Sequence, residues 1–298
     1  MNNIKNVFSI KDLENLSGIK AHTIRIWEKR YNVLQPMRTD TNIRLYSLPS
    51  LQKLLNITLL HDYGYKISKI ATFTDDKIVE MTRQIVSNKN AKNHAVNALK
   101  MAMMNFDQEL FSNTYNWLQE EKSFKEIFHQ VFIPLMEEIG LLWQTDTITP
   151  AHEHFISCLI LKKILVNIEK AEEVKPINTD KVYVLSLPLN EIHSLGLVYL
   201  NYEIVSKGYR VVYLGESLPL DNLKDLKKHF NSIVFLSYFS TQPDREYVND
   251  YVKAMGEVLL GEGSQIWLIG KMTQFVDCNL LPTDVKVFNS ILDLTENI

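Results

Sequence analysis

Cysteine is scarce in this chain, and long hydrophobic runs are missing. Cys158 and Cys278 are the only cysteines among 298 residues, and they lie far apart in the sequence. Two distant cysteines support neither a disulfide framework nor a cysteine zinc site. No stretch approaches the roughly 18 to 20 apolar residues that a membrane helix needs. The first residues, MNNIKNVFSIKDL, are too polar for a secretory signal, so we expect a cytoplasmic protein.

Charge is nearly balanced over the whole chain but unevenly distributed along it. Residues 1–75 hold 11 Lys and Arg against 6 Asp and Glu, a net charge of +5, whereas residues 76–298 hold 21 against 29, a net charge of −8. A basic head on an acidic body predicts that the head binds a polyanion. With 298 residues and 46% hydrophobic side chains, the chain is expected to form two or three globular domains.

The head carries the pattern of a winged helix-turn-helix. Ser9 is placed to cap a first helix, Gly18 to form a turn, and residues 20–31 to form a second helix. Pro36 is expected to stop that helix before a turn-rich hairpin, and Gly64 to break the two helices that follow. This order, with "NIRLYS" as its most specific piece, resembles the MerR family of transcription regulators over about 65 residues.

The resemblance implies a dimer that places its second helix in the major groove of DNA and its hairpin on the flanking backbone. Arginine and lysine reach phosphates or guanine edges, and tyrosine hydroxyls reach phosphate oxygens. The alternative is that Trp27 and Tyr31 belong to the core and the arginines to a solvated face. The residues that the resemblance places on DNA are Thr23, Arg25, Lys29, Arg30 and Tyr31 from the helix, and Arg38, Arg44 and Tyr46 from the hairpin.

Residues 76–176 show apolar residues at helical spacing, with few glycines and prolines between them. Pro150 suits the first turn of the last helix, and short connections favour an antiparallel four-helix bundle. Met101, Met103 and Met104 are expected to fill gaps in the bundle core.

Residues 177–298 alternate strand and helix patterns, which predicts a flavodoxin-like, doubly wound parallel sheet. The strands are expected at VYVLSL, RVVYLG, SIVFLS, QIWLIG and VKVF, and the helices at about 195–207, 220–230 and 244–260. The chain is therefore expected to combine α and α/β domains, divided at 1–75, 76–176 and 177–298. Ligands of such sheets bind beyond the carboxyl ends of the strands.

The spacing of "EIHSLG", "SYF" and "GK" resembles the cobalamin-binding module, whose pattern is Asp/Glu-x-His-x-x-Gly, Ser-x-Leu and Gly-Gly. The resemblance implies that His193 replaces the benzimidazole of cobalamin as the lower ligand of cobalt. Glu191 would fix the tautomer of that imidazole. Gly196 would let the backbone approach the corrin, Ser237 would offer its hydroxyl to the displaced nucleotide tail, and Gly270 belongs to the same site.

A second motif, Trp143 followed after nine residues by Glu153 and His154, resembles the helical cap of the CarH/LitR group of light-sensing, cobalamin-dependent MerR-like repressors. There the indole covers the upper corrin face and shields a 5′-deoxyadenosyl group, with the Glu and His near that group. The order of the domains also matches, so this resemblance spans essentially the whole chain. It implies a repressor that forms a homo-oligomer, a dimer or a tetramer. Its assembly and operator binding would respond to adenosylcobalamin or light, with methylcobalamin as an alternative cofactor.

Three residues depart from these patterns. Phe239 stands where the module has Leu, and Lys271 where it has its second Gly, and both add bulk near the nucleotide slot. Gln144 stands where the light-sensing members have a histidine that ligates cobalt after photolysis. One expectation is therefore cobalamin binding without that photochemical route. The alternative is a MerR-like regulator whose α/β domain is cofactor-free and serves protein interaction.

Plainer roles remain open for single residues. His193 could bond the start of the helix that follows it, and Trp143 could plug the end of the bundle. His152 and His154 are two positions apart, so they lack the one-turn spacing of a metal pair on a helix. We do not expect an enzyme, because no length remains for the barrel of some 250 residues that cobalamin enzymes often carry. No coherent catalytic set is found either.

Overall fold

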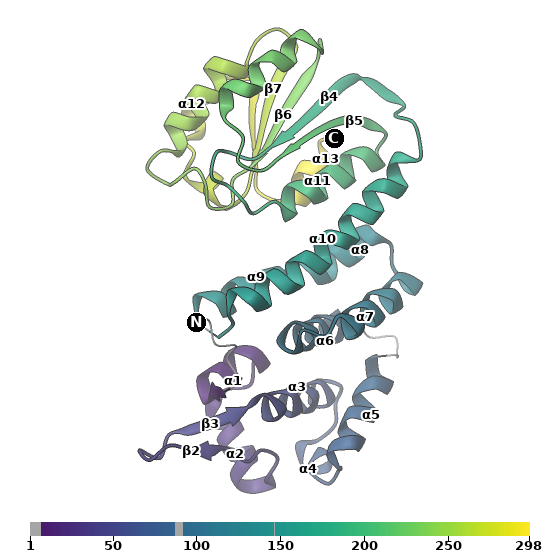
Figure 1. The fold of residues 1–298 in the computed structure, drawn as a ribbon, viewed down its shortest axis with the longest axis vertical. Helices are drawn as coiled ribbons and strands as arrows, with labels where there is room; N and C mark the ends of the chain where they lie inside the picture. Colours follow the sequence, from purple (N-terminus) through teal and green to yellow (C-terminus); the bar gives the residue numbers. More distant parts are fainter. Residues whose placement is uncertain (1–6, 87–91, 146) are drawn as a thin grey trace. The chain divides into compact units, whose positions relative to one another are not determined.

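The chain forms two compact units, Met1–Ile160 and Leu161–Ile298, and each is described by itself (Figure 1). The structure is a computed structural model that describes residues 7–86, 92–145 and 147–298. None of the helices in these described residues is both long and apolar enough to cross a membrane.

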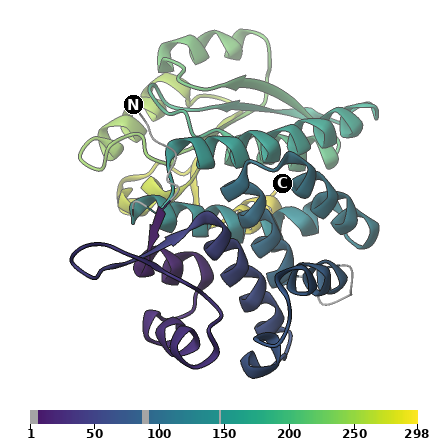
Figure 2. The ribbon, with the colours of Figure 1, turned by 60° about the horizontal axis from the view of Figure 1, so that its bottom comes forward.

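The head of the first unit is a winged helix-turn-helix, as the sequence predicts. Its elements are β1 (Val7–Ser9), α1 (Ile10–Ser17), α2 (Ala21–Tyr31), β2 (Met37–Arg38), β3 (Arg44–Ser47), α3 (Leu48–Asp62) and α4 (Ile67–Ile70). Ser9 caps α1 in a capping box with Asp12, and Gly18 ends α1 in the left-handed conformation. The short strand β1 was not expected; it pairs with β3 and completes a three-stranded antiparallel sheet. In Figure 2 the hairpin of β2 and β3 projects from the helices of the head.

Helix α2 ends at Tyr31, as expected, but the residue that stops it is not Pro36. The helix stops at Asn32, which adopts a left-handed conformation with φ of 53° and donates its N–H to the Glu28 carbonyl. Asparagine tolerates this conformation better than most residues, so it ends the helix before Pro36 can act.

Further helices complete the first unit. They are α5 (Asp75–Val86), α6 (Lys92–Asn105), α7 (Gln108–Glu121), α8 (Phe124–Ile127), a π-helical turn η1 (Phe128–Phe132), α9 (Ile133–Gln144) and α10 (Pro150–Glu172), whose last part enters the second unit. Helix α6 contacts α3, α7 and α9. Met103 and Met104 are buried and Met101 is half-buried, which confirms their role in the core.

The second unit is a five-stranded, wholly parallel sheet in the order β5-β4-β6-β7-β8, which confirms the predicted doubly wound fold. The strands are β4 (Asn178–Ser186), β5 (Tyr209–Gly215), β6 (Ile233–Tyr238), β7 (Ser264–Ile269) and β8 (Val285–Phe288). The helical segments are α11 (Leu195–Ser206), η2 (Leu220–Lys228), α12 (Val248–Leu259), η3 (Lys271–Phe275), η4 (Cys278–Leu280) and α13 (Ile291–Glu296). Segment η2 is a 3₁₀ helix rather than the expected α-helix, and Leu223 is its buried residue.

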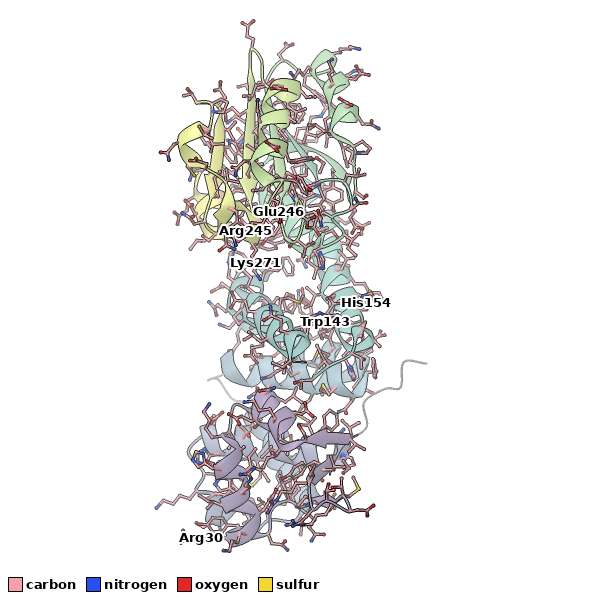
Figure 3. The ribbon with its side chains drawn as sticks, turned by 90° about the vertical axis from the view of Figure 1, so that its left-hand side faces the viewer. Arg30, Trp143, His154, Arg245, Glu246 and Lys271 are labelled. Carbon is pink, nitrogen blue, oxygen red and sulfur yellow. The ribbon has the colours of Figure 1, made fainter. Side chains whose placement is uncertain are left out.

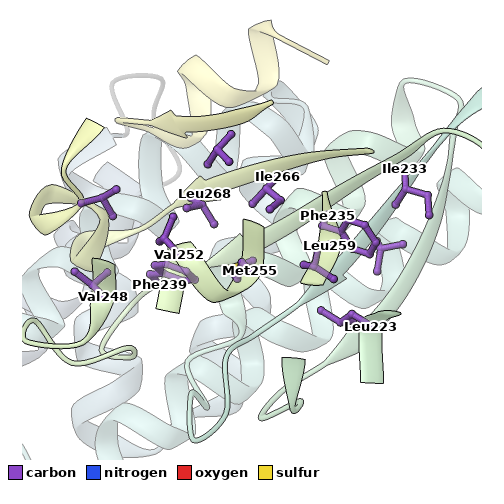
Figure 4. Close-up of a cluster of buried hydrophobic side chains, with 13 residues drawn as sticks. Leu223, Ile233, Phe235, Phe239, Val248, Val252, Met255, Leu259, Ile266 and Leu268 are labelled. Atoms are coloured by element: carbon purple, nitrogen blue, oxygen red, sulfur yellow. The ribbon is translucent and has the colours of Figure 1, made fainter. Parts of the chain in front are cut away.

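One face of this sheet packs against α12 in a continuous hydrophobic core (Figure 4). The side chains of Phe235, Ile266 and Leu268 from the strands meet Val252 and Met255 from α12. This packing holds the strands in register, so that their carboxyl ends and the loops that follow them form one edge of the sheet.

Candidate DNA-binding face and cofactor site

Helix α2 has a buried face and a basic face. Ile24 and Trp27 are buried in the head, which confirms Trp27 as a core residue. Arg25, Lys29 and Arg30 are exposed, and Thr23 is half-buried. The structure therefore presents the predicted cations of this helix to solvent, as binding to phosphates or base edges requires.

Two further features of α2 are visible in the structure. The Arg30 guanidinium lies 5.4 Å from the centre of the half-buried Tyr31 ring, a cation–π contact that restrains it. Ile26 is 52% exposed on the same side as the cations, an apolar side chain suited to contact a thymine methyl group. Sequence reasoning missed Ile26, although its four-residue spacing to Arg30 places both on one face.

The hairpin is tied to α2 through Glu28, and this corrects the role expected for Tyr46. Tyr46 is fully buried, and its hydroxyl donates to Glu28 Oε1, so it cannot reach a DNA phosphate. Arg44 Nε donates to Glu28 Oε2 at 3.1 Å, which commits part of its guanidinium to the head. Arg38 is exposed and donates to Asn42 within the hairpin. Arg38 is therefore the hairpin cation best placed for DNA.

At the carboxyl edge of the sheet, a buried carboxylate holds the predicted cobalt ligand. Oε1 of Glu191 lies 2.6 Å from Nδ1 of His193 and accepts the backbone N–H of His193 at 3.0 Å. Its Oε2 accepts the N–H groups of Thr241 and Gln242 at 2.6 and 2.8 Å. The Glu191 side chain is fully buried, so one carboxylate joins the loop after β4 to the loop after β6.

The protonation state of this pair follows from its contacts. Burial by itself would raise the pKa of Glu191, but the N–H groups of Thr241, Gln242 and His193 and the His193 side chain lower that pKa to about 2. Because an ionised carboxylate can only accept, Nδ1 of His193 carries the proton. The imidazole is 55% exposed, and no protein group within the described residues bonds its Nε2. In the neutral ring, the lone pair is therefore on Nε2, the nitrogen that faces away from Glu191.

The other predicted residues of this edge have structural partners. A Cβ on Gly196 would lie 2.5 Å from the Tyr238 ring, and a Cβ on Gly270, at φ of 119°, would lie 2.4 Å from the Phe239 carbonyl oxygen. Protein packing alone therefore requires glycine at both positions. Ser237 is buried and donates its hydroxyl to the Ser186 carbonyl at 2.8 Å, which leaves its oxygen lone pairs, rather than its proton, for a ligand.

The two bulky departures lie in different surroundings. Phe239 is fully buried in the core beneath α12, where its ring meets the Tyr251 ring edge-on at 5.8 Å (Figure 4). Lys271 is exposed, directly after Gly270 (Figure 3). The lysine thus adds charge to the surface of this edge, whereas the phenylalanine adds volume to the core.

The residues of the predicted cap motif differ in exposure. Trp143 is 47% exposed in the last turn of α9, and His154 is exposed at the start of α10 (Figure 3). Glu153 accepts from Ser157 Oγ at 2.7 Å and lies 3.4 Å from His154 Nε2. The indole is therefore partly open to solvent rather than a plug closed within the bundle.

His152 has structural partners in the first unit. It is buried, it stacks on the Phe106 ring at 4.8 Å, and its Nδ1 accepts the Thr149 N–H at 3.2 Å. Burial lowers the pKa of His152, which favours the neutral ring. Within the part of the chain that the structure describes, no three His, Cys, Asp or Glu side chains gather as metal ligands.

Sequence reasoning also missed residues around His193. Leu189, Ile192 and Tyr247 are large apolar side chains, and all three are exposed in the two loops that Glu191 joins. Exposed apolar side chains on these loops suit a largely apolar ligand surface. Thr241 escaped notice because the carboxylate that it contacts lies 50 positions earlier in the chain.

Two family models match parts of this chain. Residues 8–77 match the MerR HTH family regulatory protein family, and residues 95–165 match the B12 binding domain family. The HTH-type transcriptional repressor CarH of Myxococcus xanthus is 26% identical over 222 residues, 72% of this chain and 73% of that protein. The HTH-type transcriptional repressor CarA of the same organism is 21% identical over 243 residues, 80% of this chain and 79% of that protein.

Among solved structures, the Methanosarcina barkeri monomethylamine corrinoid protein superposes with a TM-score of 0.55 and 13% identity, over 70% of this chain and 97% of that chain. At that identity the likeness concerns the fold alone. The family matches and the two relatives, by contrast, identify domains within the chain. The chain thus carries a MerR-type helix-turn-helix domain at residues 8–77 and, at residues 95–165, a segment of the B12 binding domain family.

Proposed function

We propose that this protein is a cytoplasmic, cobalamin-responsive regulator of transcription that represses by binding operator DNA as a homo-oligomer, a dimer or a tetramer. The observation that carries the proposal is the Glu191–His193 pair at the carboxyl edge of the sheet. Its buried carboxylate orients a half-exposed imidazole and leaves Nε2 available. The basic face of α2 supplies the DNA-binding half of the function.

The residues of the α/β unit fit a corrinoid. Bound cobalamin would supply a cobalt ion able to take a nitrogen ligand from the protein. His193 Nε2 is the protein ligand that we propose, and Glu191 holds its tautomer. Leu189, Ile192 and Tyr247 offer apolar contacts to a macrocycle. Gly196, Ser237 and Gly270 shape the edge on which the ligand rests, beyond the packing that already requires them.

For the upper side of the cofactor we propose Trp143, Glu153 and His154, on the strength of the shared motif. A partly exposed indole can cover a ligand at little desolvation cost. We propose adenosylcobalamin as the natural form. Gln144 replaces the histidine of the light-sensing members, and an amide is a poor metal ligand. Control by binding of the cofactor, rather than by light, is therefore our primary proposal.

Cofactor retention tests the proposal most directly. The full chain, mixed with adenosylcobalamin in the dark and passed through a desalting column, is expected to keep about one corrinoid per chain in its visible spectrum. Parallel samples with methylcobalamin, and with green illumination before the column, identify the preferred form and any light response. A colourless protein in every sample would instead favour the second candidate, a regulator whose α/β unit serves protein interaction.

DNA binding is tested with a duplex selected by the full chain from a random library. Lys29→Ala is expected to weaken binding to that duplex and to lower the slope of log affinity against log salt by about 1, because one phosphate contact is lost. Lys224→Ala is the control, since this exposed lysine lies in η2 of the α/β unit. Equal salt slopes for the wild type and Lys29→Ala would show that Lys29 makes no phosphate contact.

A further inference from the structure

The first helix of the head is hydrogen-bonded to the segment that carries the cap motif. Nδ2 of Asn15, near the end of α1, donates to Oγ1 of Thr147 at 3.2 Å. The next residue, Leu16, offers its carbonyl to Nζ of Lys100 in α6 at 3.3 Å. The same ammonium lies 2.6 Å from Oε2 of Glu138 in α9. We refer to Asn15, Leu16, Lys100, Glu138 and Thr147 as the α1 contact.

Leu16, Lys100 and Thr147 of the α1 contact are buried, whereas Asn15 and Glu138 are half-buried. Lys100 is 6% exposed, and a buried ammonium is costly unless its charge is compensated. Here the compensation comes from the Glu138 carboxylate and from a carbonyl in the last turn of α1, the negative end of the helix dipole. Thr147 is fully buried and donates its backbone N–H to Leu142 at 2.9 Å. Movement of α1 would therefore take one of its two acceptors from the buried Lys100 ammonium, and would leave Thr147 Oγ1 with Thr145 Oγ1 alone.

The two ends of the α1 contact adjoin the two proposed sites. On one side, Leu16 is followed by the turn at Gly18, and the recognition helix α2 begins at Ala21. On the other side, Thr147 lies between Trp143 and Glu153, the two parts of the cap motif. The α1 contact therefore lies within a few residues of the recognition helix on one side and of the cap motif on the other.

We propose that the α1 contact transmits the state of the cap segment to the recognition helix, which makes Asn15, Lys100 and Thr147 positioning residues for DNA binding. This inference rests on the proposed function. A ligand can change DNA affinity only if it favours one arrangement of the head over another. The α1 contact supplies that preference, because it forms only when α1 and the segment between α9 and α10 keep this placement. By linkage, DNA must then change the affinity for cobalamin by the same factor.

Two substitutions on opposite sides of the contact test the inference. Asn15→Ala removes the donor from the head, and Thr147→Val removes the acceptor from the cap at nearly constant volume. Thr72→Val is the control, because this exposed threonine of the head bonds only the Lys69 carbonyl in the described structure. For each protein, affinity for the selected duplex is measured with and without adenosylcobalamin, and affinity for adenosylcobalamin with and without the duplex.

In both variants, the ratio between the DNA affinities measured with and without adenosylcobalamin is expected to lie at least about threefold closer to 1 than in the wild type. A factor of this size corresponds to the loss of one net hydrogen bond. The ratio between the adenosylcobalamin affinities measured with and without the duplex should move toward 1 by the same factor. In the cofactor-free variants, amide exchange of α1 and α2 should rise by a similar factor, whereas Thr72→Val should match the wild type in every measurement. Wild-type ratios in both variants would overturn the inference. A wild type that binds no adenosylcobalamin, or selects no duplex, would instead mark failure of the proposed function itself.

Discussion

His193→Ala is expected to remove the imidazole-bound signature from the visible spectrum of the cobalamin complex and to weaken cobalamin binding by about tenfold or more. Nδ1 of this histidine is held by Glu191 at 2.6 Å, so the native ring loses little rotational freedom when Nε2 binds a metal. Alanine removes the nitrogen and leaves Glu191 bonded to the loop after β6. The loss should therefore concern coordination rather than folding.

Free imidazole provides a sharper version of this test. Because the native ring is half exposed, added imidazole should reach the space left by His193→Ala and restore the coordinated spectrum. His229→Ala is the matched control, an exposed histidine in the same unit that follows η2. An unchanged spectrum in His193→Ala, with unchanged affinity, would show that another group ligates cobalt.

The second large effect is expected from Glu191 in the cofactor-free protein. Its pKa is lowered from an ordinary value of 4.5 to about 2 in the folded state. A lowered folded pKa means that the stabilisation is complete above about pH 4.5 and is lost as the pH falls toward 2. We expect a contribution of about 2 kcal/mol to the free energy of unfolding, less than the full shift implies because water near the loops screens the charge.

Urea denaturation of the wild type and Glu191→Gln at pH 6 and pH 3 measures this contribution. The amide exchange of the strands reports on the α/β unit alone. The variant should be less stable than the wild type at pH 6, and the difference should shrink at pH 3. Glu246→Gln is the control, since this exposed carboxylate lies in the loop after β6. If the free energy of unfolding of the wild type exceeded that of Glu191→Gln by as much at pH 3 as at pH 6, this result would contradict the ionised, multiply bonded state of Glu191.

Much of the architecture could be read from local patterns. Apolar runs marked the five strands at their observed places, and Ser9 and Gly18 marked the two ends of α1. These features depend on neighbours within a few residues, so they are encoded locally. The end of α2 at Tyr31 was also predicted, but the residue that stops the helix was not, because the left-handed conformation of Asn32 is a weaker sequence signal than Pro36.

The sequence by itself determined the order of the elements, the residue types of the two candidate sites and the spacing that links them to known families. Only the tertiary structure decided which polar groups are consumed internally. In the folded chain, the Tyr46 hydroxyl donates to Glu28 and the Ser237 hydroxyl donates to the Ser186 carbonyl. The α1 contact joins Asn15 to Thr147, which lies more than one hundred residues later in the chain. The reason is that a buried donor or acceptor must find a partner, and the partner is chosen by packing between distant segments rather than by neighbours in the chain.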